Sequence, residues 1–147
     1  MDLRPAQSDS EIAAALELRE RVFSGEQRVS IAADRDGRDD ESTHLVAVDG
    51  DRVLGTCRLL FRGNVARLGR LAVDPDRRGE GIAAALLALA DKVAFQQGAD
   101  AISLHAQTYA RRLYLDAGYE ERGPEFVEEG IEHVSMGKRL DPTRAGL

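Results

Sequence analysis

Hydrophobic and polar positions alternate along the chain in two kinds of segment, which predict a mixture of strands and helices. Stretches with a period of two predict strands, and stretches whose apolar positions recur every three to four residues predict helices. The predicted strands cover about residues 3–6, 43–48, 52–61, 65–73, 101–106, 119–122 and 131–139, and the predicted helices cover about 11–23, 81–97 and 108–117. Turn residues mark the boundaries, such as Asp49-Gly50 between two strands and Gly98 after the second helix.

The order of these segments predicts an α/β (α+β) fold built on one mixed central sheet. The three strands within residues 43–73 follow one another through short turns, which predicts an antiparallel meander. The segment 65–106 runs strand, helix, strand, which predicts a parallel pair joined by a right-handed crossover. We therefore expect about seven strands, with helices on both faces of the sheet.

Residues 24–42 lack a clear period and are predicted to form a loop. This segment holds a mostly acidic cluster that consists of Asp34, Asp36, Asp39, Asp40 and Glu41. A run of charges is most often a solvated face, and the functional alternative is an acidic rim for a cationic substrate. Arg19 falls on the apolar stripe of the first predicted helix, where it needs a carboxylate partner or a path to water. Glu26 is the partner near it in sequence.

Length and composition predict one globular domain, residues 1–140, followed by a tail at 141–147. The 147 residues are enough for one substantial core, and the net charge of −6 argues against general nucleic-acid affinity. No apolar run is long enough to cross a membrane and the N-terminus lacks a signal-peptide pattern, so we expect a cytoplasmic protein. The single cysteine, Cys57, excludes an internal disulfide and fits a reducing compartment.

The segment 67–84 carries the strongest chemical signal, because an apolar strand leads through a proline turn into two arginines, two glycines and a helix start. Gly79 and Gly81 let the backbone approach a ligand, and the first amides of a helix lack intrahelical partners at the positive end of its dipole. These features predict a phosphate cradle, to which Arg77 and Arg78 can add donors. A Walker A ending and a third dinucleotide glycine are missing. Taken alone, the segment fits a simple strand-to-helix turn equally well.

Two spaced motifs resemble the GNAT family, the Gcn5-related N-acetyltransferases. Residues 78–83, Arg-Gly-Glu-Gly-Ile-Ala, resemble its signature Gln/Arg-x-x-Gly-x-Gly/Ala, and the RLAVDP before them is of the family's kind. Residues 107–119 resemble its Asn-x-x-Ala-x-x-Leu-Tyr-x-x-x-Gly-Phe pattern, with Gln107 in place of the Asn. The stretches LRERVFSGEQ, DESTHLVA, HAQ and EEGIEHVSM are similar to the ElaA-like and YjcF-like subgroup of this family.

The resemblance implies a GNAT fold with a splayed parallel pair, and acetyl-CoA as the co-substrate. The pyrophosphate would lie on the backbone of residues 78–83, and the pantetheine would follow the strand edge at 71–73. The residues that the resemblance assigns to co-substrate binding are Leu71, Ala72, Val73, Arg78, Gly79, Gly81, Ile82, Ala83, Ala84, Gln107 and Tyr114. Tyr114 would protonate the departing thiolate, since a phenol is protonated at neutral pH. The structural alternative for Tyr114 is a core tyrosine.

The implied reaction is direct transfer of an acetyl group to a primary amine in a ternary complex. The ammonium must lose a proton before it attacks, and the candidates for the base are Glu26, His133, the pair Glu128 and Glu129, and a chain of water molecules. No metal is expected, and Cys57 is expected to be a core residue.

Several acceptors and functions are compatible with the resemblance. The acidic segment favours a small, cationic amine, and a protein lysine or N-terminus is the alternative acceptor. A regulatory module that binds acetyl-CoA without turnover is a third hypothesis. An acyl-homoserine-lactone synthase shares the Leu-Arg…Val-Phe…Glu start, but such enzymes are usually longer. Dimers are common in the family, so a homodimer is compatible with the resemblance.

Overall fold

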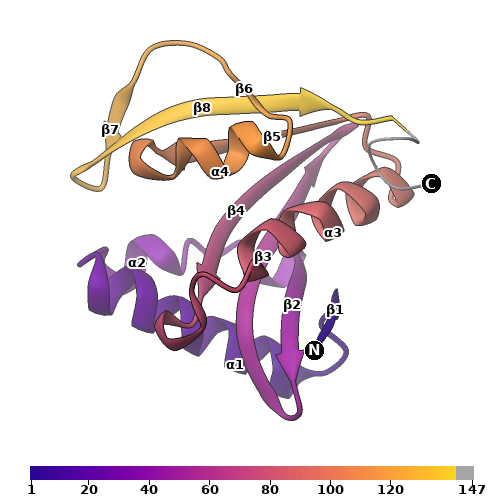
Figure 1. Ribbon diagram of the computed structural model, residues 1–147, viewed down its shortest axis with the longest axis vertical. Coiled ribbons are helices and arrows are strands. Elements are labelled where there is room, and N and C mark those ends of the chain that lie inside the picture. Colours follow the sequence, from indigo (N-terminus) through magenta and orange to yellow (C-terminus); the bar gives the residue numbers. More distant parts are fainter. Residues whose placement is uncertain (142–147) are drawn as a thin grey trace.

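The computed structural model describes residues 1–141 and shows one eight-stranded sheet (Figure 1). Strands β1 (Asp2–Pro5), β2 (Thr43–Asp49), β3 (Arg52–Arg62) and β4 (Val65–Val73) are antiparallel neighbours in that order. β4 pairs in parallel with β5 (Ala101–Gln107), and β8 (Ile131–Arg139) pairs antiparallel with β5. The short strands β6 (Glu120–Glu121) and β7 (Phe126–Glu128) both pair with β8. The predicted tail lies outside the described residues, except for Asp141.

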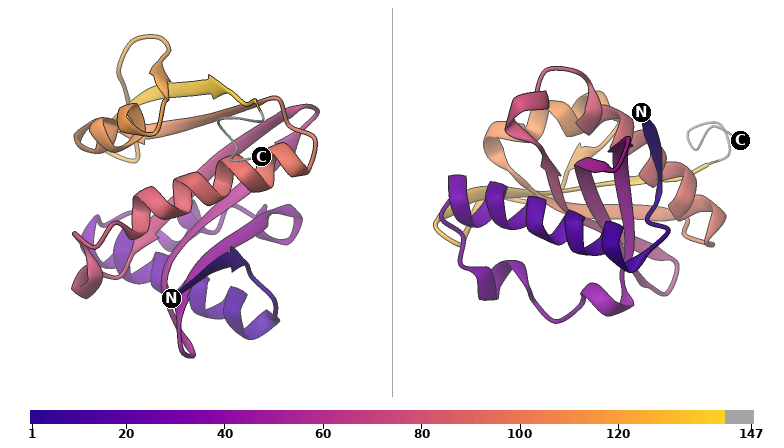
Figure 2. Two further views of the ribbon diagram at one scale, coloured as in Figure 1. Left: turned by 45° about the vertical axis from the view of Figure 1, so that its right-hand side comes forward. Right: turned by 90° about the horizontal axis from the view of Figure 1, so that it is seen from below.

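Helices cover both faces of the sheet, as predicted (Figure 2). The first helix, α1 (Asp9–Arg19), continues as a π-helical segment, η1 (Glu20–Glu26), and is followed by α2 (Ile31–Asp34) and a 3₁₀ turn, η2 (Asp39–Glu41). A second 3₁₀ turn, η3 (Pro75–Arg77), leads from β4 toward α3 (Ile82–Gln96). A last 3₁₀ turn, η4 (Thr108–Ala110), leads from β5 into α4 (Arg111–Asp116).

The hydrophobic core is divided by the sheet into two clusters, because successive strand residues point to opposite faces. On one face, Ala15 and Leu18 of α1 pack with Val46 and Val48 of β2. On the other face, the larger cluster joins α3 and α4 to the alternate residues of the same strands, among them Leu45, Ala47, Leu86, Leu87 and Ala90. Each fully buried large aliphatic side chain contributes about 1.5–3 kcal/mol. Strands β2, β3 and β4 are therefore packed between α1 on one face of the sheet and α3 and α4 on the other.

The parallel strands β4 and β5 separate after a short paired segment. Their pairing covers residues 65–67 of β4 and 101–103 of β5, and the register between β3 and β4 shifts soon afterwards. Between the pairs Arg58–Gly69 and Thr56–Ala72, β4 has one residue more than β3, which is a β-bulge. Arg70, within the bulge, has a left-handed φ of 56°. The splayed pair expected for this chain is confirmed, and the bulge turns β4 away from β5.

The structure differs from the predicted elements in three places. Residues 24–42 are not a continuous loop, because η1 extends into this segment and α2 and η2 lie within it. The first helix changes to π-helical geometry at Glu20, and at the end of that segment the amide of Gln27 donates to the carbonyl of Val22, five residues earlier, at 3.2 Å. Residues 124–130, for which no strand is predicted, contain β7, so the sheet has one strand more than the expected seven. Within residues 1–141, no helix is both long and apolar enough to cross a membrane.

Candidate functional site

The predicted cradle lies where the chain leaves β4 and enters α3. Gly79 and Gly81 have φ values of 84° and 83°, and a Cβ placed on either would meet no atom within 4 Å. Gly81 is the N-cap of α3, and no side chain caps this helix start. A Cβ on Gly55 of β3 would lie 2.7 Å from Ile82 Cγ2, so this glycine lets the first turn of α3 rest directly on the sheet. The helix start thus offers backbone donors in an open, left-handed turn.

Arg77 and Arg78 are both held by carboxylates. Arg78 forms two hydrogen bonds with Glu26, in which Nη2 lies 2.7 Å from Oε1 and Nη1 lies 2.9 Å from Oε2. These bonds hold the pKa of Glu26 below its usual range and raise that of Arg78. Arg77 pairs with Glu80 at 2.9 Å. The Glu26 carboxylate is therefore engaged at the rim of the cradle, and it is not the partner of Arg19.

The edge of β4 that faces β5 is unpaired at residues 71–73, between the point where the two strands separate and the cradle. Residues 71–73 follow the bulge and have no pairing with β5, whose strand partner beyond residue 103 is β8. Gln107, at the end of β5, donates from Nε2 to Oε1 of Gln27 at 2.7 Å, and Gln27 donates to the Tyr109 hydroxyl at 2.9 Å. These contacts fix η1 beside the opening between the two strands.

Tyr114 lies on α4, and 8% of its surface is exposed. Its ring packs in the larger core cluster and meets Tyr119 edge-on, with ring centroids 5.8 Å apart. Among residues 1–141 its hydroxyl forms no hydrogen bond of standard geometry. Burial raises the pKa of the Tyr114 phenol above its ordinary value, so the group stays protonated over the physiological range. The structure thus shows a buried tyrosine that keeps its proton, which is the form that a donor requires.

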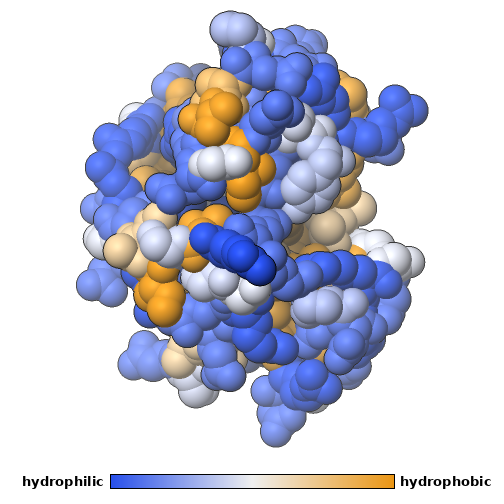
Figure 3. All heavy atoms as spheres, turned by 90° about the vertical axis from the view of Figure 1, so that its left-hand side faces the viewer, coloured by the Kyte–Doolittle hydropathy of each residue, from blue (hydrophilic) through white to orange (hydrophobic). Residues whose placement is uncertain are grey.

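A cavity of about 680 Å³ opens between the splayed strands. Its walls include Leu71 of β4 and Gln107 of β5, and on the other side Phe23, Ala33 and the turn between β7 and β8. Viewed from the left-hand side of Figure 1, the surface carries separate groups of hydrophobic atoms with strongly hydrophilic atoms between them (Figure 3). Because Leu71 is one of its lining residues, the cavity adjoins the edge of β4, and its walls are both apolar and charged.

His133 reaches this cavity from β8. It is 6% exposed, and its ring stacks on Phe126 with centroids 5.8 Å apart. Its Nδ1 lies 2.7 Å from the carbonyl oxygen of Ile131, so Nδ1 carries the hydrogen and the lone pair is on Nε2. Glu128 Oε2 lies 3.8 Å from that Nε2, close enough to stabilise an imidazolium. The His133 imidazole is thus held in one orientation, with a carboxylate beside its Nε2.

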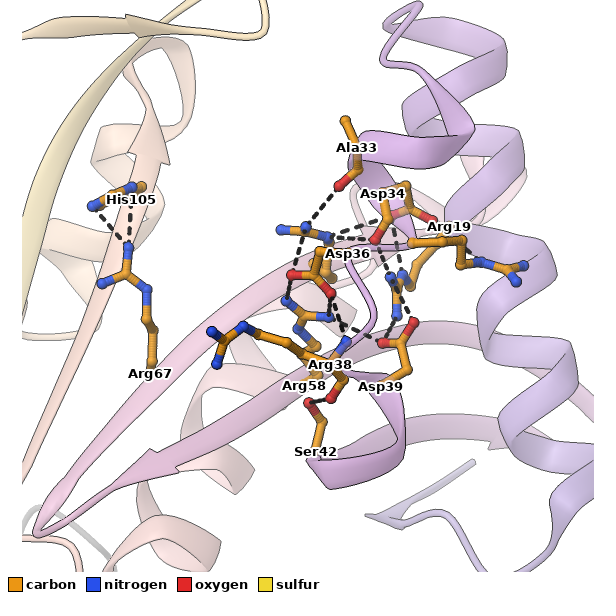
Figure 4. A network of polar contacts seen from close by, with 12 residues as sticks. Arg19, Ala33, Asp34, Asp36, Arg38, Asp39, Ser42, Arg58, Arg67 and His105 are labelled. Atoms are coloured by element: carbon orange, nitrogen blue, oxygen red, sulfur yellow. Dashed lines mark hydrogen bonds and ion pairs between the residues drawn. The ribbon is translucent and has the colours of Figure 1, made fainter.

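Three aspartates of the acidic segment, Asp34, Asp36 and Asp39, form an ion-pair network instead of a free rim, whereas Asp40 and Glu41 are exposed (Figure 4). Arg19 is 1% exposed, and it pairs with Asp34 at 3.2 Å and with Asp39 at 2.7 Å. Arg58 binds Asp36 and Asp39, and Arg70 binds Asp36 at 3.3 Å. Hydrogen bonds from Arg58 hold the pKa of Asp36 well below its usual range. The expected pairing of Arg19 with Glu26 is wrong, because two aspartates of the folded-back segment reach it instead.

Cys57 is a core residue of β3, and burial raises the pKa of its thiol to about 12. A thiol in that state is a poor nucleophile. No cluster of three or more metal-ligating side chains occurs within the part of the chain that the structure describes.

Comparison with known proteins agrees with this geometry. The family model described as "Acetyltransferase (GNAT) domain" matches residues 5–140. The chain is 31% identical over 134 residues to YjcF, an uncharacterized N-acetyltransferase of Bacillus subtilis (strain 168), covering 90% of this chain and 96% of YjcF.

Solved structures share the fold. One from Lactobacillus plantarum is 30% identical with a TM-score of 0.88, covering 95% of this chain and 97% of that one. Escherichia coli ElaA is 24% identical with a TM-score of 0.85, covering 94% and 99%. An aminoglycoside 6'-N-acetyltransferase complexed with coenzyme A is 16% identical with a TM-score of 0.78, covering 97% and 98%. The uncapped glycine turn, the splayed strands and the family match together place this chain in the GNAT family of N-acetyltransferases.

Proposed function

We propose that this protein transfers an acetyl group from acetyl-CoA to a primary amine held in the cavity between β4 and β5. The observation that carries the proposal is the continuity of three features: the uncapped start of α3, the unpaired edge of β4 and the cavity beside that edge. A GNAT neighbour of the same fold was solved with coenzyme A, which supports this co-substrate. The backbone at residues 78–84 would receive the pyrophosphate, and residues 71–73 would bond the pantetheine amides.

The residues present fit this co-substrate. Positive φ values at Gly79 and Gly81 leave open space where a side chain would stand, so phosphate oxygens can approach the amides of Ile82 and Ala83. Arg78 lies at the rim, where it can exchange Glu26 for a phosphate. Ala84 is exposed on the same first turn and adds no bulk. Gln107 borders both the cavity and the edge of β4.

We assign the general base to His133. Its Nδ1–H is held by the Ile131 carbonyl, so Nε2 can accept the ammonium proton, and Glu128 then stabilises the imidazolium. The neutral amine nitrogen attacks the thioester carbonyl carbon, the carbon–sulfur bond breaks, and the nitrogen loses its second proton as the amide forms. That proton passes to the departing sulfur, so the products are the amide and the free CoA thiol. Glu26 is the weaker candidate, because its carboxylate is bound to Arg78 and its pKa is lowered. Holding the two substrates together supplies most of the rate in such a transfer.

Tyr114 is the proposed donor to the departing sulfur. Its raised pKa keeps the phenol protonated, and a thiol ordinarily ionises near about 8.5. Complete proton transfer from the phenol to the thiolate is therefore energetically unfavourable. Tyr114 contributes to catalysis first by donating a hydrogen bond to the developing thiolate. The Tyr114 hydroxyl has no competing hydrogen bond of standard geometry within residues 1–141, although the residue is buried and does not line the cavity.

The test is a screen of primary amines that detects release of the free CoA thiol. The wild type should release thiol with a subset of amines and produce the N-acetylated amine by mass spectrometry. Tyr114→Phe should bind acetyl-CoA with unchanged affinity and turn over more slowly. If acetyl-CoA binds but no amine, peptide or lactone precursor reacts, the protein is a binding module. If thiol release by Tyr114→Phe equals that of the wild type with every amine, the role of Tyr114 is wrong.

A further inference from the structure

We propose that the acceptor amine carries an anionic group, a carboxylate or a phosphate, that binds Arg67 and Arg62 at the end of the cavity formed by the β3–β4 hairpin. This inference rests on the proposed transferase function and names its substrate class. It replaces the cationic acceptor that the acidic composition of residues 34–41 favours.

Four of the five carboxylates of the acidic segment are occupied by arginines, and the fifth, Asp40, is exposed and does not line the cavity. Asp34 pairs with buried Arg19, and Asp36 and Asp39 pair with Arg58. Arg38 pairs with Glu41 at 3.3 Å. Three aspartates thus face three guanidiniums, those of Arg19, Arg58 and Arg70, in one nearly balanced network. A cationic substrate would have to displace an arginine to reach any of these aspartates.

Two arginines on the cavity wall lack such a counterion. Arg62 ends β3 opposite Val65, and Arg67 lies on β4 opposite Leu60, so both belong to the same end of the hairpin. Within residues 1–141, neither forms an ion pair with a carboxylate. The contact of Arg67 is with the His105 ring, where Nη2 lies 2.8 Å from Nε2 and 3.1 Å from Nδ1 (Figure 4). Arg62 and Arg67 are both exposed, and their guanidiniums have N–H donors left for an incoming anion.

The opposite wall is suited to the amine. Glu128 lies on β7, with Oε1 at 3.2 Å from His105 Nδ1 and Oε2 at 3.8 Å from His133 Nε2. This arrangement assigns the hydrogen of His105 to Nδ1, so that Nε2 accepts from Arg67. An ammonium group beside Glu128 and His133 therefore lies one imidazole ring away from the guanidinium of Arg67.

This spacing defines the acceptor more closely. A single imidazole separates the cationic wall from the anionic wall, so the amine and the anionic group are joined by a short chain. Short aminocarboxylates and aminoalkyl phosphates have this layout. A diamine would place its second ammonium against Arg67, and like charges in contact disfavour binding.

The experiment compares acceptors that share the amine and differ in the anionic group. The pairs are 3-aminopropanoate with 3-aminopropanamide, and 2-aminoethyl phosphate with 2-aminoethanol, with 1,3-diaminopropane as the cationic probe. We expect kcat/KM to be about tenfold or more higher for at least one anionic member than for its neutral partner. The pair that shows the larger ratio identifies carboxylate or phosphate as the preferred group.

Three variants test whether Arg67 causes this preference. Arg67→Gln should raise KM for the anionic member and leave the neutral one unchanged, so that the ratio falls to about threefold or less. Arg67→Lys should retain part of the ratio, because it keeps the charge. Arg139→Gln is the matched control, because this variant removes the same charge from the protein. Arg139 lies at the far end of β8, opposite Ala101. The control variant should leave the ratio unchanged.

A binding measurement separates this inference from the proposed function. Calorimetry with protein saturated with CoA measures acceptor affinity without turnover. If nothing is acetylated but anionic amines bind in an Arg67-dependent manner, the transferase proposal fails and the anionic site stands. If neutral amines or the diamine bind and react as well as the anionic members, or if Arg67→Gln weakens all acceptors alike, the inference is overturned.

Discussion

Gly81→Ala separates the conformational role of Gly81 from its proposed role in binding acetyl-CoA. Gly81 stands at φ 83° and ψ 12° directly before α3, and a Cβ there would meet no atom within 4 Å. The cost of the variant is therefore backbone strain without a clash, about 1–2 kcal/mol for an alanine in the left-handed region. A loss of 1 kcal/mol lowers the Tm of a domain of this size by about 3 °C. The expected decrease in Tm is about 3–6 °C.

Gly98→Ala is the matched control for this strain. Gly98 follows the opposite end of the same helix, has a φ of 95°, and also offers open space for a Cβ. Both variants should lose similar stability. Only Gly81→Ala places a methyl group where the pyrophosphate would approach the first amides of α3. We expect its Kd for acetyl-CoA to rise about tenfold or more, equivalent to about 1.4 kcal/mol, with no more than about a twofold change for Gly98→Ala.

Thermal unfolding and isothermal titration calorimetry on the same preparations give the two quantities. An unchanged Kd in both variants, accompanied by the expected loss of Tm, would refute the cradle. A Kd that rises equally in both variants would mean that affinity follows overall stability and not contact at the helix start.

Three further predictions concern the base, the buried ion pair and the acidic network. His133→Gln should lower kcat by about 10²–10⁴-fold in the thiol-release assay while calorimetry shows unchanged acetyl-CoA affinity, and a kcat within a factor of about two of wild type would exclude His133 as the base. Lys138→Met should destabilise the fold by about 3–5 kcal/mol in urea unfolding, since it removes the 2.6 Å contact with buried Asp91, whereas Lys138→Met combined with Asp91→Leu should recover much of the loss. The lowered pKa of Asp36 predicts stability that is fully present above about pH 4 and is lost as the pH falls toward the folded-state pKa. Acid unfolding of Asp36→Asn should show a shallower decline below pH 4, and a decline as steep as wild type would contradict this linkage.

The elements with long, regular patterns could be predicted from the sequence. The β2–β3–β4 meander and α3 have a clear hydrophobic period and end at glycine turns, and the structure has them within one or two residues of the expected bounds. Strand β7 could not be predicted, because its three residues stand between Pro124 and Gly130, whose turn signals dominate so short a window. Its pairing with β8 comes from tertiary context, which local patterns do not carry.

The partners of charged side chains could not be predicted from sequence proximity. Glu26 is seven residues from Arg19 but binds Arg78, 52 residues away, because η1 continues α1 and carries Glu26 past the sheet to the cradle. Asp34 reaches Arg19 because α2 packs against η1, the segment that begins directly after Arg19. The place of Arg19 on the apolar stripe predicts either a carboxylate partner or a path to water, and spacing alone could not decide between them or identify the partner.

The bulge in β4 links the acceptor wall to the proposed co-substrate edge. Arg70 holds a left-handed φ of 56°, which costs about 1–2 kcal/mol for a residue with a Cβ. Its guanidinium donates to the carbonyls of Ala33 at 3.0 Å and Asp34 at 3.2 Å, and these bonds offset the strain. The same residue thus fixes α2 to the strand at the point where that strand leaves β5. Because the next residues of β4 are those proposed to hold the pantetheine, the network around Arg70 sets the position of the acceptor wall relative to the thioester.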